Sequence, residues 1–397
     1  MSILNSSMEN LSNRFPHLSS NILNEINDQS VFNCKESSRK MNNFIVSEKF
    51  FWLRIIQKYR GNFVEFNDAW NKIIKKSSIN FVKQLSQATY RFFTKRSPRL
   101  EKQWHPLFIV GDQGCLSLFK CINEKIEDKN PKGYSGCSVL HIAAQEGHFD
   151  ICKFILENVG DKSFLDDMGS TPIYRAAGNG QVETCRLLLN FFGDEHLRSK
   201  VGITPLHAAA LNGHLEVYKV VMDYFVDKNP RTVQNWNSLH LRLPLGQTPL
   251  HNAAQEGHLD ICELIVKYAS DKNPIRNDRL TPLHIASYKG HLEICKLLIH
   301  AAANKSPQDY QGMTPLHFAA KYGHLEICKF LMEEASEKNP RDNSGDTPLS
   351  LAKKNRHFKT AWFIRKYLAN QKFQAHQNLT TWLHVKLIST CLYFLGY

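Results

Sequence analysis

A pattern of apolar and polar positions recurs along the middle of the chain, always in the same order. Each copy holds a short segment with a leucine and two small residues, then a glycine, then a longer segment with apolar residues at i, i+3 and i+4 spacing. The copy that begins at Thr248 reads TPLHNAAQEGHLDIC, and close variants begin at Thr281 and Thr314. The spacing predicts two helices per copy and an all-α protein.

The copies follow one another at a nearly constant interval. The interval is the same at every step but one, because the step from Thr204 to Thr248 is longer than the others. Counting back one interval from the first full copy reaches His105, where a degenerate copy follows. We therefore expect seven to eight stacked repeats over residues 105–370. The full copies begin at Ser138, Thr171, Thr204, Thr248, Thr281, Thr314 and Thr347.

Each residue type in a copy has a mechanical reason to be there. Thr248 can cap a helix with its hydroxyl, and Pro249 suits the first helical position, where no amide donor is needed. Ala253 and Ala254 let neighbouring helices approach closely. Gly257 is expected to end the first helix in a left-handed conformation that a side chain would penalise. The polar links between copies contain Pro, Asn, Asp and Gly, which form turns.

This helix–turn–helix unit, with TPLH near its start and a period of about 33 residues, resembles the ankyrin repeat. The resemblance implies L-shaped units stacked into a curved solenoid, in which the long turns project as hairpin fingers beside a groove lined by the first helices. It implies that the TPLH histidine bonds backbone groups at the base of the fingers, and that the protein binds other proteins without catalysing a reaction. Tyr174 departs from the pattern at one histidine position. In the last copy Ser350 and Asn355 replace histidine and glycine, as expected of a cap that faces water.

His251, His258 and Cys262 have spacings that could pass for metal ligands. Zinc needs its ligand atoms about 2.0–2.3 Å from one point. The pattern instead places His251 in the first helix and Cys262 on the apolar side of the second, while equivalent residues of neighbouring repeats are separated by about 8–10 Å. Five cysteines share this apolar position, which indicates buried thiols in a reducing compartment. We predict no catalytic residue, metal or cofactor, and a cytoplasmic protein with the nucleus as the alternative location.

The net charge of +13 belongs to the two ends of the sequence. Residues 1–100 carry +9 and residues 351–397 carry +8, whereas residues 101–350 carry −4. No stripe of Lys and Arg with interleaved aromatics runs along the middle, so nucleic acid is not favoured as a partner. The interpretation is solvated helix faces, and the alternative is contact with an acidic partner or nucleic acid. No apolar run reaches the ~18 residues of a membrane span.

The N-terminal hundred residues do not follow the repeat. Residues 1–12 are rich in Ser and Asn and are predicted to be disordered, and residues 61–104 form a helical connector. Residues 13–60 contain a proline, an ILNEI segment, a polar middle and a closing FFWLRII, which together resemble an F-box. The resemblance implies a small helical domain that docks a Skp-type adaptor through Phe15, Pro16, Ile22, Leu23, Ile26 and Trp52. The alternative is a helical bundle that caps the solenoid.

Two further segments lie outside the repeat pattern. Eleven extra residues precede Thr248 and lengthen one finger, 231–247, which includes Trp236. The finger is either a partner-contact loop, a segment folded back onto its neighbours, or an error in the gene model. The tail, residues 371–397, is expected to pack on the last repeat.

We predict a non-catalytic protein–protein interaction module that serves as a substrate-recognition subunit of a cullin–RING ubiquitin ligase. The alternative is a scaffold or inhibitor with no role in ubiquitin transfer. Residues that face the groove or the finger tips differ from copy to copy while the repeated pattern does not, and these are the candidate contacts. They are Gln145, Glu146, Asn179, Leu211, Trp236, Asn252, Gln255, Glu256, Tyr288, Lys289, Tyr310, Lys321 and Tyr322.

Overall fold

The structure is a computed structural model, and it describes residues 85, 105–159, 164–193, 197–200, 202–233, 245–302, 304–335, 337–374 and 377. Regular structure in these residues is helical, apart from one isolated bridge between Lys132 and Ser138. The predicted all-α array is therefore confirmed for the part of the chain that the structure describes. The segments 1–12 and 13–60, the connector apart from residue 85, residues 234–244 and most of the tail lie outside it.

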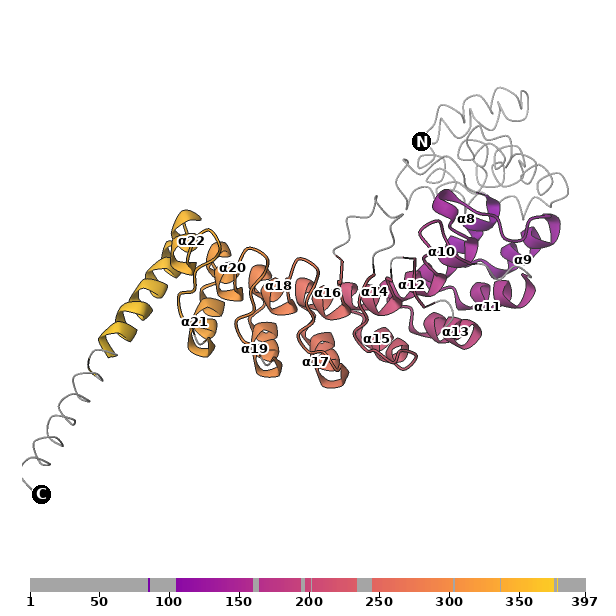
Figure 1. The fold of residues 1–397 in the computed structure, drawn as a ribbon. Coiled ribbons are helices and arrows are strands. Elements are labelled where there is room, and N and C mark those ends of the chain that lie inside the picture. Colours follow the sequence, from indigo (N-terminus) through magenta and orange to yellow (C-terminus); the bar gives the residue numbers. More distant parts are fainter. Residues whose placement is uncertain are drawn as a thin grey trace, which may run out of the picture. The chain divides into compact units, whose positions relative to one another are not determined.

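The chain divides into two compact units, Met1–Leu197 and Arg198–Tyr397. The described part of the first unit contains three helix pairs and one 3-10 turn (Figure 1). In chain order these are α8 (Pro106–Asp112), α9 (Leu116–Lys125), η2 (Tyr134–Gly136), α10 (Val139–Glu146), α11 (Phe149–Asn158), α12 (Pro172–Gly178) and α13 (Val182–Phe192).

The described part of the second unit contains five helix pairs. In chain order these are α14 (Pro205–Asn212), α15 (Leu215–Met222), α16 (Pro249–Glu256), α17 (Leu259–Tyr268), α18 (Pro282–Lys289), α19 (Leu292–Ala301), α20 (Pro315–Tyr322), α21 (Leu325–Glu334), α22 (Pro348–Lys354) and a last helix over residues 358–374. Within each unit the first helix of a pair stacks on the first helix of the next, and the second helices form a row beside them (Figure 1). The described residues thus hold eight pairs, the upper end of the predicted number.

The first helices of the repeats begin at a capping residue and end near a residue with a left-handed conformation. Thr248 caps α16 with its hydroxyl, Pro249 occupies the first helical position, and Gly257 ends the helix with a left-handed φ of 85°. The last repeat keeps the cap without a histidine, because the Ser350 hydroxyl accepts from the Thr347 amide at 2.8 Å. The expectation that Asn355 replaces the glycine is wrong by one position: Arg356 lies nine residues after the capping Thr347, where other repeats have glycine, and it adopts the left-handed conformation with φ 62°.

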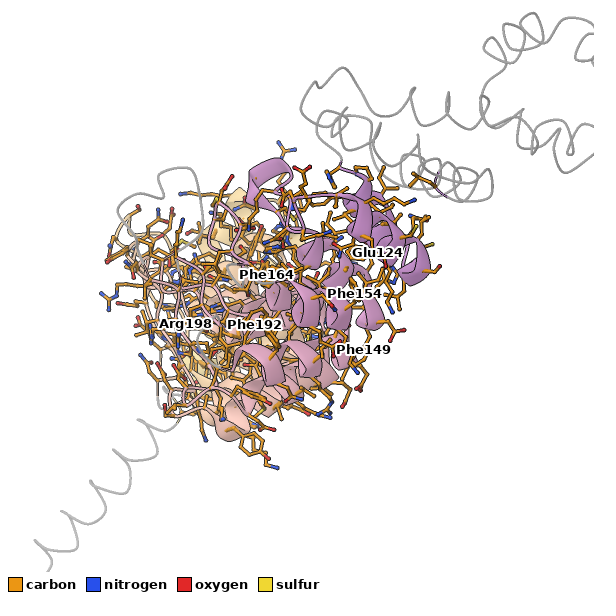
Figure 2. The ribbon with its side chains drawn as sticks, turned by 90° about the vertical axis from the view of Figure 1, so that its right-hand side faces the viewer. Glu124, Phe149, Phe154, Phe164, Phe192 and Arg198 are labelled. Atoms are coloured by element: carbon orange, nitrogen blue, oxygen red, sulfur yellow. The ribbon has the colours of Figure 1, made fainter. Side chains whose placement is uncertain are left out.

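The core lies between the two rows of helices. In α16 and α17 the buried side chains include Leu250, Ala253, Ala254, Ile261 and Cys262. The other repeats bury the equivalent positions except for the last, where Leu349 is half-buried and Lys353 is exposed. In the first unit aromatic rings add to this core. Phe164 and Phe192 are labelled in Figure 2, and their rings meet edge to face with centroids 6.0 Å apart. The rings of Phe119 and Phe154 meet in the same way, also at 6.0 Å.

Candidate protein-binding surface

The TPLH histidines join each repeat to the one that follows. In five repeats the ring Nδ1 lies 2.8–3.0 Å from the hydroxyl of the capping Ser or Thr. Nε2 lies 3.1–3.2 Å from the carbonyl oxygen of the residue just before the next repeat. The pairs are His141–Ser170, His207–Gln247, His251–Leu280, His284–Met313 and His317–Asp346. This confirms the bonding at the base of the fingers that the ankyrin resemblance implied.

The partners of these histidines fix their protonation state. A carbonyl oxygen can only accept, so Nε2 carries the proton and donates it, and Nδ1 of the neutral ring accepts from the capping amide. Burial favours the neutral ring and lowers the pKa of His141, His207 and His284 to about 4. Burial lowers the pKa of His251 to about 3. Both ring nitrogens are therefore engaged within the protein.

A second set, the histidines that follow the glycine at the end of each first helix, bonds in the opposite direction. We refer to them as the GH histidines. In four of them the Nε2 atom donates to a carbonyl oxygen near the end of the preceding first helix. The pairs are His148–Asp112 at 2.7 Å, His258–Leu211 at 3.2 Å, His291–Gln255 at 3.2 Å and His324–Tyr288 at 2.9 Å.

The GH histidines also explain why the helix-ending positions beneath them are glycines. A Cβ atom built on Gly257 would lie 2.7 Å from the ring of His291, and one on Gly290 would lie 2.7 Å from the ring of His324. These glycines therefore combine a positive φ with a close approach to the next repeat. Sequence reasoning assigned no role to these histidines. The signal that could have found them is the equal spacing from each of these glycines to the GH histidine of the next repeat.

The repeated cysteines take no part in any site. Cys152, Cys185, Cys262, Cys295 and Cys328 are fully buried on the second helices. Burial raises the pKa of Cys152, Cys185, Cys295 and Cys328 to about 12, and it raises that of Cys262 as well. Within the described ranges, no group of three or more His, Cys, Asp or Glu side chains is placed to hold a metal ion.

Most of the predicted contact residues lie at the ends of the first helices. The exposed ones are Asn179, Leu211, Glu256, Tyr288, Lys289 and Tyr322, and the half-buried ones are Gln145, Glu146, Gln255 and Lys321. Tyr310 is exposed on the finger between α19 and α20, where the backbone amide and side-chain amide of Asn343 donate to the carbonyl oxygens of Gln311 and Tyr310 at 2.9 and 3.0 Å. Trp236 lies outside the described residues.

Asn252 differs from the other predicted contacts, because its side chain is only 9% exposed. Its amide nitrogen donates to the carbonyl oxygen of His207 at 3.0 Å, and its amide oxygen accepts from Gln247 at 2.7 Å. The Gln247 oxygen in turn accepts from Arg276 at 2.9 Å. Asn252 thus belongs to a polar network that joins the repeats beginning at Thr204 and Thr248 at the base of the extended finger, and we leave it out of the binding surface.

Four of the predicted residues come together in what we call the tyrosine–lysine cluster: Tyr288 and Lys289 of α18 with Lys321 and Tyr322 of α20. The two tyrosine rings pack edge to face with centroids 4.5 Å apart, yet remain 39% and 42% exposed. The Lys289 amine lies 5.2 Å from the centre of the Tyr288 ring, and the Lys321 amine lies 5.7 Å from that of Tyr322. At the ends of α10 in the first unit and α16 in the second, the Gln145 and Gln255 side chains each donate to the glutamate that follows them.

The GH histidines hold the backbone of this surface in place. His324 bonds the carbonyl oxygen of Tyr288, His291 that of Gln255, and His258 that of Leu211. The side chains at these positions can point outward while their main chain is fixed. A pre-positioned surface of this kind loses little conformational entropy when it binds.

Stacked helix pairs joined by two sets of histidines define a class, the α-helical repeat solenoids. The chain belongs to the ankyrin repeat family. The family model for ankyrin repeats (3 copies) matches residues 107–195, 140–232, 191–273, 233–309 and 302–377. Members of this family bind proteins and are typically non-catalytic.

Comparison with solved structures shows the same fold. The ankyrin repeat domain of human ASB11 is 24% identical, and the match covers 59% of this chain and 99% of that domain with a TM-score of 0.50. The fold matches 512 solved chains, so likeness of fold does not identify a partner. No curated protein sequence matches the chain. In the described residues, no helix has the length and apolar character needed to cross a bilayer.

Proposed function

We propose that the protein is a recognition subunit that binds a partner protein on the first-helix ends, with the tyrosine–lysine cluster at the centre of the contact. The observation that carries the proposal is the exposed, mutually packed pair Tyr288 and Tyr322. Tyrosines lose few rotameric states on binding and supply both apolar area and a hydroxyl, which is why they are frequent hot spots. The lysines beside them would favour carboxylates on the partner.

The charges along the first-helix ends of the second unit also support the tyrosine–lysine cluster as the centre of the contact. The equivalent positions of α16 carry Gln255 and Glu256, whereas those of α18 and α20 include Lys289 and Lys321. A partner segment with an apolar or aromatic side chain between acidic residues therefore fits the cluster. Its acidic residues would be repelled from the end of α16, which fixes the orientation of the segment.

The test compares two substitutions of the same kind. Tyr288→Ala combined with Tyr322→Ala removes the paired rings. Tyr268→Ala is the matched control, because Tyr268 is exposed on the second helix α17 and Lys267 lies 5.1 Å from its ring centre. The wild-type protein and both variants are used as baits, and the enriched proteins are quantified and then titrated individually. Partners lost with the double variant and retained with the control support the proposal, and partners retained equally by all three would refute it.

We further propose that residues 13–60 dock a Skp-type adaptor and so link the bound partner to a cullin–RING ubiquitin ligase. Support comes from the sequence order alone: Phe15 and Pro16, then Ile22, Leu23 and Ile26, then Trp52, as in an F-box. These residues lie outside the described part of the chain. The mechanism would be proximity, because tethering raises the effective concentration of the substrate near a ubiquitin-loaded enzyme.

Co-purification with the Skp-type adaptor tests this second step. Ile22→Asp combined with Trp52→Ala should abolish the association, whereas Tyr288→Ala with Tyr322→Ala should leave it intact. Absence of association, or association indifferent to the first pair of changes, would remove the ubiquitin role. The protein would then act as a scaffold or inhibitor, because the tyrosine–lysine cluster is complete without the N-terminal segment.

A further inference from the structure

The last helix of the described array, residues 358–374, carries a stripe of exposed aromatic side chains. Phe358 is 70% exposed, and Trp362 and Phe373 are each 63% exposed. At about 100° per residue, these three and Ala369 fall within an arc of about 60° on one side of the helix. The stripe extends over about 22 Å of helix length, at about 1.5 Å per residue.

The opposite side of the same helix packs on the array. Ala361 and Ile364 are buried, and the Tyr367 hydroxyl donates to the carbonyl oxygen of Met332 at 3.2 Å. The amine of Lys329 on α21 lies 5.9 Å from the ring centre of Phe363. The helix is therefore held in place by its inner face, and the aromatic stripe points away from the repeats.

Cationic side chains flank the stripe on both sides. Lys359 and Lys366 follow one edge and Arg365 and Lys372 the other, at the same helical spacing, and all four are exposed. The Lys366 amine lies 5.0 Å from the ring centre of Trp362. Residues 351–397 contain no Asp or Glu, so no acidic residue of this segment offsets these charges.

The other second helices of this unit do not have this composition. Lys296 on α19 and Lys329 on α21 each pair with a glutamate at the start of the same helix, at 2.8 and 2.7 Å. Counted from the repeat start, Trp362 takes the place of Lys329, and Lys359 takes the place of Glu326. At these two positions the terminal helix thus has one cation and an aromatic ring in place of a surface ion pair. A terminal repeat that only faced water would keep a polar outer side.

We propose that the helix at residues 358–374 docks on an anionic phospholipid surface. The aromatic stripe would enter the boundary between headgroups and acyl chains, and the four cations would contact lipid phosphates and carboxylates on either side of it. A single convex helix face offers no groove for a peptide. A flat membrane surface, in contrast, can contact the three aromatic rings and both rows of cations at the same time. Trp and Phe are suited to this boundary because their rings are apolar and, for Trp, the indole nitrogen stays hydrated.

The test is flotation of the full-length protein with vesicles of phosphatidylcholine alone or with 30 mol% phosphatidylserine, at about 0.1 and 0.5 M NaCl. We expect at least tenfold stronger partitioning onto the anionic vesicles at low salt, and a marked loss at high salt. Phe358→Ser with Trp362→Ser should reduce the partitioning at least tenfold. Lys359→Gln with Lys366→Gln should reduce only the phosphatidylserine-dependent part.

Phe149→Ser is the matched control, because Phe149 is exposed at the same repeat position on α11 in the first unit (Figure 2). This variant and Tyr288→Ala with Tyr322→Ala should partition like the wild type, which separates the lipid contact from the protein-binding surface. No binding to anionic vesicles, or binding unchanged by the terminal-helix variants, would overturn the proposal. So would a change in oligomeric state on sedimentation without an effect on vesicles, which would assign the stripe to a second copy of the chain.

Discussion

Mild acid should unfold the array, because the TPLH histidines are buried in the neutral form. Burial lowers the pKa of His141, His207 and His284 from the ordinary 6.5 to about 4, and that of His251 to about 3. The folded pKa lies below the unfolded one, so the unfolded chain binds more protons as the pH falls from 6.5 toward 4. Stability that is fully present above pH 6.5 is therefore lost across that window.

The size of the loss follows from the two pKa values. At pH 5 a free histidine is almost fully protonated while a buried one with a pKa near 4 is about one-tenth protonated, which costs about 2 kcal/mol per residue. At pH 6 the cost is still about 1 kcal/mol per residue. The second unit holds His207, His251 and His284, so it should lose about 6 kcal/mol at pH 5. That is comparable to the whole stability of a typical domain, about 5–15 kcal/mol.

Urea unfolding followed by far-ultraviolet circular dichroism at pH 7, 6 and 5 measures this slope. His284→Ser is the informative variant, because Ser350 shows that a serine at this position still bonds the capping amide. It removes the bond to Met313 and should cost about 1–3 kcal/mol at pH 7. It should also make the fall from pH 7 to pH 5 smaller by about 2 kcal/mol. A flat profile in the wild type, or a slope unchanged in the variant, would refute the reasoning.

Three further predictions concern the backbone and the thiols. Gly257→Ala should lower the free energy of unfolding in urea by about 2–3 kcal/mol, because the new Cβ displaces the His291 ring in addition to straining the left-handed backbone. Gly345 has φ 82° but nothing within 4 Å of a new Cβ, so Gly345→Ala should lower it by only about 1 kcal/mol. Arg279→Gly should raise the free energy of unfolding by about 0.5–1 kcal/mol, because Arg279 has φ 62° at a position where the finger of the next repeat has glycine. An unchanged melting temperature would contradict this prediction. Iodoacetamide at pH 8 should label the five buried cysteines only after denaturation, and peptide mapping would identify the labelled sites: Cys152, Cys185, Cys262, Cys295 and Cys328. Labelling of these sites in the native protein would contradict their burial.

The repeat could be predicted from the sequence, and the bonds made by the TPLH histidines could be predicted from its resemblance to the ankyrin repeat. The capping threonine, the proline and the glycine of each copy act within a few residues of one another, so they can be recognised without knowing how repeats stack. The same holds for the ion pairs within one turn of the second helices, such as Glu293 with Lys296.

The pairing of Tyr288 with Tyr322 could not be predicted from the sequence in the same way. The two residues lie seven and eight positions after their threonines, so their contact depends on the offset between α18 and α20. Asn252 shows the opposite case. The residue at this position varies between copies as a contact residue would, but the Asn252 side chain accepts a hydrogen bond from Gln247 at the base of the extended finger. Both outcomes depend on geometry between repeats, which one sequence does not display.

The two sets of histidines separate the stability of the array from its binding specificity. At the first-helix ends the main chain is bonded by the GH histidines, while the side chains of Gln255 and Tyr288 are half-buried and exposed. Surface substitutions of this kind usually change stability by less than about 0.5 kcal/mol. The side chains at Gln255 and Tyr288 can therefore be exchanged to suit a different partner without loss of the fold. The packed pair of Tyr288 and Tyr322 contributes about 0.5–1.5 kcal/mol, which is small beside a typical domain's stability of about 5–15 kcal/mol. A loss of binding in the double variant would therefore report on the contact itself and not on unfolding.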